Sequence, residues 1–569
     1  AERYKQTLYD HLGSDILNKN KMPEQPLQKI YVIPKHFFDK KDFLIRYKQQ
    51  LAIFRTRILK EEKEELKGSL NAFYYACCNA DLDKRTKLQI HLLFFETLAF
   101  YAQMYKSVET CLNIIRTLES KELKEKLAGK FPIDTKLLFA ETYMIHYELV
   151  KFEEPIFSPE KTGLLIKAKS YLWKTYLHHL DGVNKLNEIE LSHCLALLSR
   201  SLTELSRWFE GLRYLNEAKL HLFRNPNIEY LRAMLLQAIK QKTCLSYNDL
   251  LNLSIIDSCT EASELPNILD AQKEQLNGVK KECKIELSKH SIDVKTLRSH
   301  RASASEKFKM YSEYKKFCSI NELFLNEHSF FCNCSKSTRD DIGVRTNHPH
   351  TKIAWAEKFE NLIDEFAGDF IIARHNYYHS LENVKIPSFS VNSIKRRNST
   401  DTVKNALLKN AFKSFYSILD QIAHGILKVM EIDHEAKINS KYPDPNKRPK
   451  IYFLNMWDLD LFTAKDFTEN FYLVSLYSIA QDLNRSDFAA LEEFRTIRNA
   501  IEHKTLFIRN AEGRDTLKGK VDNVYSKESL LEKTRILMML TKSAIFSFTY
   551  LIRRQSKSIE VHEIAAVSL

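Results

Sequence analysis

The sequence predicts a nearly all-α protein, with helical hairpins stacked in its N-terminal half and a helical bundle at its C-terminal end. Glycine and proline number only 12 and 13 in 569 residues, roughly a third to a half of average usage, whereas sheet proteins need many turns built from these residues. Apolar residues also recur every three or four positions over long stretches, which is the helical period. The length suggests several domains, which we place at residues 1–68, 69–300, 301–350 and 351–569.

The first segment, residues 1–68, is predicted to be helical with an interruption. Proline residues break the polar stretch 15–38. From Asp42 to Leu66, Lys and Glu side chains lie three or four positions apart, which favours one continuous helix.

Residues 69–300 show pairs of amphipathic helices separated by short polar turns. The clearest pair carries large apolar residues at helical spacing on both sides of its turn: Leu198, Leu202, Leu205, Trp208, Leu212, Leu215 and Ala218. Such a hairpin cannot bury its apolar face alone, so neighbouring hairpins are expected to stack into a solenoid. Residues 202–219 resemble a tetratricopeptide repeat (TPR), in which a small residue and an aromatic residue flank the turn. An irregular helical bundle is the alternative, because the repeats show no fixed period.

The C-terminal part is predicted to be a connector followed by a bundle. Residues 301–350 mix aromatic, Asn, Asp and turn residues, which is typical of a connector with little regular structure. Helical patterns then follow at Ile353–Leu381, Thr402–Ile432, Asp466–Lys504 and Lys527–Ser556. Four long helices in one segment favour an up-and-down bundle. The Pro-, Asp- and Lys-rich insert 433–462 is predicted to be a loop or a small appended element.

Charge and cysteine usage bear on partners and compartment. A formal net charge of +13 favours a polyanionic partner such as RNA. We expect no signal peptide, because the first residues are charged and lack an apolar core. The most apolar run, 536–552, contains Lys542 and is interpreted as a buried helix, so no membrane partner is expected. Ten scattered cysteines favour reduced thiols and a cytoplasmic location.

The pattern that carries chemistry ends the third bundle helix, at residues 492–505. One stripe of this helix is apolar, with side chains three or four positions apart: Phe488, Leu491, Phe494, Ile497 and Ile501. Another stripe is polar and holds Glu492, Arg495, Asn499 and His503. Asn499 and His503 are four positions apart and therefore neighbours on the helix surface, with Arg498 on their flank.

These residue types suffice to cleave RNA without a metal ion. The ribose 2′-hydroxyl attacks its own phosphodiester, which requires proton transfer and positive charge near the phosphate. Histidine titrates near neutral pH and acts as an acid or a base. Arginine stays protonated and matches the geometry of a phosphate. Asn499 can hold the imidazole or the phosphate by hydrogen bonds.

The run Arg498 to His503, RNAIEH, resembles the R-x4–6-H signature of the HEPN superfamily, including its favoured Asn after the Arg. The resemblance covers residues 351–569 and implies a metal-independent ribonuclease without a cofactor, which leaves a cyclic phosphate and works as a homodimer. It implies His503 as the acid/base group, Arg498 as the phosphate binder and Asn499 as the positioning residue. Glu493 and Arg495 are expected to support them at the substrate. Some HEPN toxins carry a Tyr two residues after the His, where an antitoxin attaches a nucleotide; here that residue is Thr505, which argues against such regulation.

The helical N-terminal half resembles the arrangement in bacterial HEPN proteins linked to toxin and antiphage systems. We expect this half to sense a protein trigger or bind an inhibitor. Other interpretations remain open. Arg498 can instead pair with Glu502 on the helix surface, and His503 can be a favourable charge at a helix C-terminus. A catalytically inactive adaptor is the second hypothesis, and a nucleic-acid-binding regulator of transcription ranks last.

Two weaker clusters complete the candidates. Arg374 and His375, near Tyr377, Tyr378 and His379, are expected to grip RNA by charge and stacking, although a cationic helix end explains them equally well. The second cluster has a C-x-C…H-x-H arrangement, made of Cys332, Cys334, His348 and His350. Zinc sites usually separate their cysteines by two to four residues, so we expect no metal here. The sequence holds no glycine-rich phosphate-binding motif.

Overall fold

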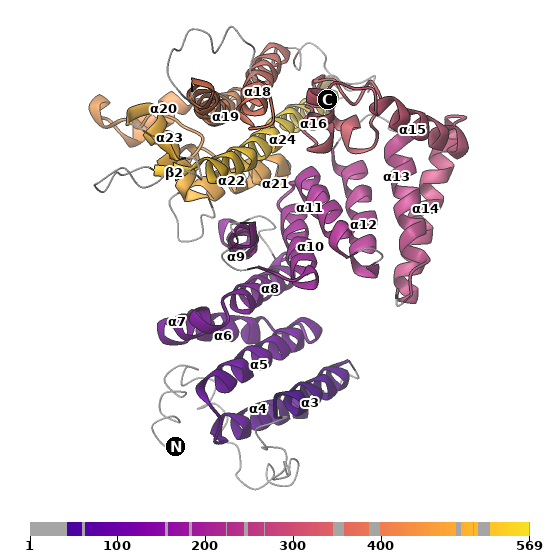
Figure 1. Cartoon of the computed structure of the whole chain (residues 1–569), viewed down its shortest axis with the longest axis vertical. Coiled ribbons are helices and arrows are strands. Elements are labelled where there is room, and N and C mark those ends of the chain that lie inside the picture. Colours follow the sequence, from indigo (N-terminus) through magenta and orange to yellow (C-terminus); the bar gives the residue numbers. More distant parts are fainter. Residues whose placement is uncertain are drawn as a thin grey trace. The chain divides into compact units, whose positions relative to one another are not determined.

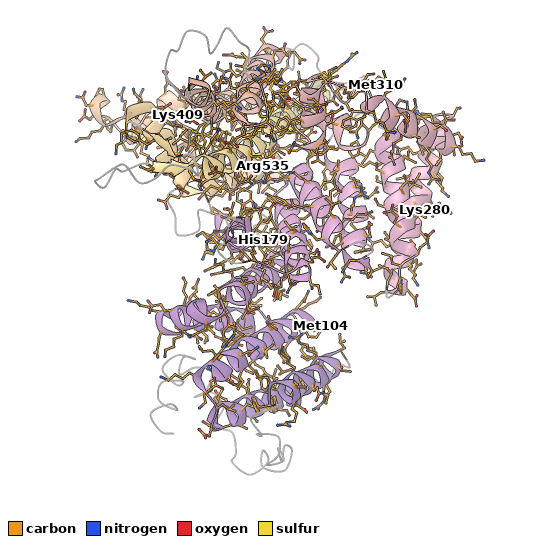
Figure 2. All side chains as sticks on the ribbon, in the orientation of Figure 1. Met104, His179, Lys280, Met310, Lys409 and Arg535 are labelled. Carbon is orange, nitrogen blue, oxygen red and sulfur yellow. The ribbon has the colours of Figure 1, made fainter. Side chains whose placement is uncertain are left out.

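The protein is almost wholly helical and divides into two compact units, Ala1–Lys185 and Leu186–Leu569 (Figure 1). Within each unit, side chains fill the spaces between neighbouring helices (Figure 2). The computed structural model describes residues 43–59, 63–153, 158–180, 182, 185–222, 225–243, 249–266, 268–344, 355, 358–385, 399–484, 491–504, 506–509 and 524–567.

The first unit contains seven described helices: α3 (Phe43–Ile58), α4 (Lys63–Asn79), α5 (Lys84–Met104), α6 (Val108–Glu119), α7 (Lys121–Lys130), α8 (Pro132–Val150) and α9 (Pro159–Leu180). The prediction of one helix from Asp42 to Leu66 is wrong, because α3 ends at Ile58 and α4 begins at Lys63. Their aromatic side chains pack together, with the rings of Tyr47 and Phe73 5.2 Å apart. Tertiary packing between two short helices therefore replaces the single helix that surface charge spacing favoured.

The second unit begins with helical hairpins. Its first helices are α10 (Glu188–Glu204), α11 (Trp208–His221), α12 (Pro226–Lys242), α13 (Asp249–Ser263), α14 (Asp270–Lys289), α15 (Val294–Phe308) and α16 (Glu313–Ile320), followed by the short helix η3 (Glu327–Phe330). The seven apolar positions predicted for the hairpin α10–α11 are all buried. The predicted connector 301–350 is partly helical, since it contains the end of α15, α16 and η3.

The turn of the α10–α11 hairpin has a counterpart between α5 and α6, one hundred positions earlier in the chain. Ser206 and Lys106 both adopt a positive φ, of 61° and 53°. In each turn the next residue donates its backbone N–H to a carbonyl five positions back, from Arg207 to Leu202 at 2.8 Å and from Ser107 to Ala102 at 2.9 Å. This is the Schellman ending of a helix, made here without glycine. Equal turns at corresponding places support the helical-repeat character of this half.

The C-terminal bundle packs four helices: α18 (Glu360–Ser380), α19 (Ser399–Val429), α22 (Phe471–Leu483) and α24 (Lys527–Val567). Smaller elements surround them: α20 (His434–Lys441), η5 (Pro445–Lys447), η6 (Met456–Asp458), α21 (Ala464–Glu469), α23 (Glu492–His503) and the strands β1 (Phe507–Arg509) and β2 (Val524–Ser526). The two strands pair in parallel, and the sequence pattern did not predict them.

The predicted third helix, Asp466–Lys504, is wrong as one element, because it is split into α21, α22 and α23. Asn470 ends α21, and its side chain accepts the backbone N–H of Tyr472 to cap α22 at 3.2 Å. A buried polar side chain thus separates two helices within a stretch whose apolar residues keep a helical spacing throughout.

Helix α24 runs through the core of the bundle. It is long and apolar enough over Lys527–Ser556 to span a membrane, yet 83% of its most apolar window is buried inside the protein. The prediction of a buried helix around Lys542 is confirmed. At Gly425, α19 approaches α24 so closely that a Cβ atom would lie 2.7 Å from the Phe548 ring.

A buried ionic cluster joins the hairpin α10–α11 to the bundle. Arg207, at the start of α11, is 2% exposed and donates to Glu210 at 2.8 and 2.9 Å. Its remaining terminal nitrogen pairs with Asp482 of α22 at 2.6 Å. Glu210 also accepts the hydroxyl of Ser543, on α24, at 3.1 Å. The hairpin and the bundle therefore share one interior.

Replacing Arg207 by Ala should strongly destabilise the protein, because it leaves Glu210 and Asp482 as buried carboxylates without their cation. Removing one partner of a buried ion pair costs about 3–5 kcal/mol. Chemical unfolding followed by tryptophan fluorescence measures the loss. Arg298→Ala is the matched control, since Arg298 pairs with Asp257 at 2.7 Å but is 57% exposed, where a pair contributes about 0–1 kcal/mol. Equal losses of unfolding free energy in Arg207→Ala and Arg298→Ala would contradict the stabilising role of the buried cluster.

Lys542 should make stability depend on pH. Its Nζ lies 4.4 Å from the Phe330 ring centroid and donates to the carbonyl of Glu322, and burial lowers its pKa to about 7. Between pH 7 and about 10.4 the unfolded lysine holds a proton that the folded lysine lacks, so this residue's contribution to stability rises with pH.

Lys542→Met removes this dependence while keeping an apolar chain of similar length. The free energy of unfolding of the variant should exceed that of wild type most at pH 7. This excess should shrink by up to about 1.4 kcal/mol per pH unit as pH rises toward 9. Denaturant unfolding at pH 7, 8 and 9 measures the difference. A difference that stays constant over this range would show that Lys542 remains charged in the folded protein.

Candidate functional site

Helix α23 carries the predicted catalytic residues and is fixed by its apolar face. Leu491, Phe494 and Ile497 are buried, as predicted, and Ile501 is half-buried; Phe488 lies outside the described residues. The Phe494 ring packs edge-on against Phe412 of α19, with centroids 5.8 Å apart. The polar side of α23 is thereby turned away from the bundle core.

Arg498 lies at the junction of α23 and α19. Its terminal nitrogen is 3.1 Å from Asp420 Oδ2, and its Nε is 3.3 Å from Glu502 Oε2. The guanidinium also lies over the ring of Tyr416, 4.8 Å from its centroid. Two carboxylates and an aromatic face thus hold a guanidinium that is 23% exposed. The alternative pairing of Arg498 with Glu502 is confirmed.

The sequence analysis missed Tyr416 and Asp420, which both lie on α19. Asp420 accepts the backbone N–H of Phe453 at 3.1 Å in addition to facing Arg498. Burial raises the pKa of Asp420 above its usual range, against the opposing effect of the Arg498 charge. Burial also raises the pKa of Tyr416. Tyr416, Asp420 and His424 recur every four residues along α19, a spacing that places them on one side of the helix and could have identified this face.

Asn499 and His503 lie on the outer side of α23. Asn499 is exposed, and the His503 side chain is 73% exposed. The Nε2 atom of His503 is 3.8 Å from Glu502 Oε2, the same carboxylate oxygen that faces Arg498. Glu502 therefore lies between the guanidinium and the imidazole and brings both to one end of the helix.

Glu493 and Arg495 lie on the first turns of the same helix. Glu493 faces Lys533 of α24 at 3.5 Å, and Arg495 is half-buried, near enough to Tyr416 for its charge to act on that hydroxyl. Their supporting role at a substrate stays a prediction.

Arg374 requires a correction. It is 1% exposed and forms a two-pronged ion pair with Asp340, at 2.7 and 2.8 Å. It also donates to the carbonyl of Leu323 at 2.8 Å and to the hydroxyl of Tyr314 at 3.0 Å. Because these acceptors enclose its guanidinium, Arg374 links α18 to the segment that contains Leu323 and Asp340. It is not placed to contact RNA.

His375, its neighbour on α18, is exposed, and its Nε2 lies 3.1 Å from His379 Nε2. Burial and the charges of His379 and Arg374 lower the pKa of His375. Among the contacts described for the two α18 residues, none reaches Arg498. Thr505, His348 and His350 lie outside the described residues.

Comparison with known proteins identifies the C-terminal region. Residues 351–555 match the family model described as LA2681-like HEPN. No curated protein and no solved structure matches the chain. The match coincides with the bundle that presents Arg498 and His503, and the helical region before it is consistent with helical repeats. Residues 351–555 of this chain are therefore an LA2681-like HEPN domain.

Proposed function

We propose that this HEPN domain is a metal-independent endoribonuclease whose active site contains Arg498, Asn499 and His503. HEPN domains are often ribonucleases, which supports the proposal. The observation that carries it is the shared carboxylate of Glu502, 3.3 Å from Arg498 and 3.8 Å from the exposed His503. A fixed cation beside an accessible imidazole is the pair of groups that cleavage through the ribose 2′-hydroxyl requires.

The reaction assigns one task to each group. An imidazole accepts the 2′-hydroxyl proton while that oxygen attacks the phosphorus, and the bond to the 5′-oxygen breaks after the leaving oxygen receives a proton. Arg498 stabilises the extra negative charge on the phosphate oxygens. Its guanidinium has five N–H donors, and its two ion pairs leave some of them for the substrate. Asn499, exposed on the same side as His503, orients the imidazole or the phosphate.

The need for both an acid and a base argues for a homodimer. One His503 cannot accept one proton and donate another in the same step, and a second copy of α23 would supply the second imidazole. The exposed position of Asn499 and His503 leaves them accessible to such a copy. We place the enzyme in bacterial defence or toxin action, in the cytoplasm, with the TPR-like helices binding a protein that triggers or restrains it.

A catalytically inactive adaptor is the second candidate, and one observation favours it. The ion pair of Arg498 with Asp420 joins α23 to α19, and its pair with Glu502 lies within α23. A purely structural arginine would make the same contacts. In that case the HEPN domain dimerises and the TPR-like helices bind protein, without cleavage of RNA.

Arg498→Ala and His503→Ala should each lower RNA cleavage at least about a hundredfold, because each removes a group that acts on the reacting phosphate. Cleavage of labelled RNA during a brief exposure to EDTA measures the effect. Arg535→Ala is the matched control for Arg498, since Arg535 of α24 (Figure 2) also pairs with a carboxylate and is 22% exposed. His290→Ala, an exposed histidine that caps the C-terminus of α14, is the control for His503. Wild-type protein that cleaves no RNA, even with candidate partners added, would contradict the nuclease and favour the adaptor.

Dimers that combine one wild-type subunit with one Arg498→Ala/His503→Ala subunit test whether the two motifs form one site. Purified through two different tags, these mixed dimers should retain under about a tenth of the wild-type rate, because one imidazole then lacks its counterpart. Retention of half the rate would indicate two independent sites and contradict a shared one.

A further inference from the structure

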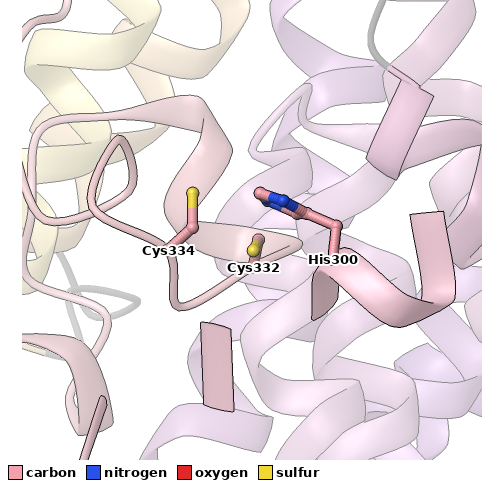
Figure 3. Close-up of side chains that lie close together, drawn as sticks. All are labelled: His300, Cys332 and Cys334. Atoms are coloured by element: carbon pink, nitrogen blue, oxygen red, sulfur yellow. The ribbon is translucent and has the colours of Figure 1, made fainter. Parts of the chain in front are cut away.

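Three metal-binding side chains meet away from the HEPN motif. His300 lies on α15, whereas Cys332 and Cys334 follow η3, and their ligand atoms all lie within 4.8 Å of one another. Figure 3 shows the His300 imidazole reaching from its helix toward the two thiols. The fold thus brings together ligand atoms from two segments about thirty residues apart in sequence.

A fourth donor lies beside one of these three. The Nε2 atom of His328, on η3, lies 3.2 Å from the Sγ atom of Cys334. Two thiols and two imidazoles are the donor set of a closed tetrahedral zinc site. Zinc–sulfur and zinc–nitrogen bonds of about 2.3 and 2.0 Å separate tetrahedral donors by roughly 3.3–3.8 Å. The ligand atoms of His300, Cys332 and Cys334, all within 4.8 Å of one another, and the 3.2 Å between His328 and Cys334 are close to this range.

The backbone around the two cysteines is already held in place. The N–H of Cys332 donates to the carbonyl of His328 at 3.2 Å. The carbonyl of Cys334 accepts from the Ser337 hydroxyl at 2.7 Å and from its N–H at 3.1 Å. Cys332 and Cys334 are 6% and 7% exposed and are free thiols. A disulfide between them would leave the convergence of two imidazoles unexplained.

We propose that His300, His328, Cys332 and Cys334 bind a structural zinc ion. The two thiols release their protons to solvent on binding, so the ion and its two thiolates are together neutral, which lowers the cost of burying them. The sequence analysis expected no metal at Cys332 and Cys334 because their one-residue spacing is unusual for zinc, and it paired them with His348 and His350. The structure supplies two other histidines.

The proposed zinc ion connects two segments of the chain. It links α15 to the segment 321–344, and three basic side chains of the HEPN helices also bind this segment. Arg374 pairs with Asp340, and Lys542 donates to the carbonyl of Glu322. Arg553 pairs with Glu327 at 2.6 Å, in the same short helix that carries His328. The ion therefore anchors the segment that connects the repeat helices with the HEPN domain.

Metal analysis of the full chain, purified without chelator, tests the proposal. About one zinc ion per chain is expected, and Cys332→Ala/Cys334→Ala and His300→Ala should abolish it. Cys77→Ala/Cys78→Ala is the matched control, because it removes two buried thiols from α4 and should retain the zinc. Wild-type protein that lacks stoichiometric zinc, or that loses it equally in the control, would overturn the site.

Cobalt(II) provides a readout that does not depend on how the variants fold. Wild-type protein stripped of metal and titrated with cobalt should show the intense visible bands of tetrahedral coordination together with thiolate-to-cobalt charge transfer, at one ion per chain. Prolonged chelation should also lower the melting temperature of wild type but not that of Cys332→Ala/Cys334→Ala. Weak octahedral spectra, or a Cys332–Cys334 disulfide in freshly purified protein, would overturn the proposal. These outcomes are independent of RNA cleavage, which is tested at Arg498.

Discussion

One buried guanidinium joins the hairpin α10–α11 to the HEPN domain. Arg207 places a positive charge between Glu210 and Asp482, in an interior where unpaired charges are very costly. Such a cluster is stable only when every member is in position, so α11 has a single acceptable register against α22. The Trp208 ring, next to Arg207 in the chain, lies edge-on to Phe471 and Tyr472 and adds apolar contacts between α11 and α22. The HEPN match begins at residue 351, yet the core to which it belongs also includes α10 and α11.

The sequence predicted the parts of this fold that depend on local periodicity. The apolar positions from Leu198 to Ala218, the burial of the helix around Lys542 and the buried face of α23 all follow from spacing along one helix. Helix ends were harder to place, because a single side chain such as Asn470 can cap and divide a stretch whose hydrophobicity is continuous. The strands β1 and β2 are three residues each, too short for an alternating pattern to be visible.

The residues around the candidate site could be predicted only in part, because pairing across the fold leaves little trace in a single sequence. Arg498 and His503 lie within one helix and form a recognisable motif. Asp420 is far from them in the chain and reaches Arg498 only after α19 and α23 pack together. Arg374 was misassigned for the same reason: its partner Asp340 comes from a segment whose course the sequence does not reveal. The convergence of His300 with Cys332 and Cys334 is likewise a product of tertiary structure.

In the proposed active site, the carboxylates that flank Arg498 also affect which anions can bind it. A phosphate that approaches the guanidinium must compete with Asp420 and Glu502, which already neutralise it at 3.1 and 3.3 Å. A small free anion offers one contact and has little with which to displace them. In the proposed nuclease, an RNA chain has neighbouring phosphates that can bind other cations of a protein with a net charge of +13, which raises the local concentration of its scissile phosphate at Arg498. If Arg498 binds phosphate as proposed, Asp420 and Glu502 favour polymeric RNA over inorganic phosphate and mononucleotides.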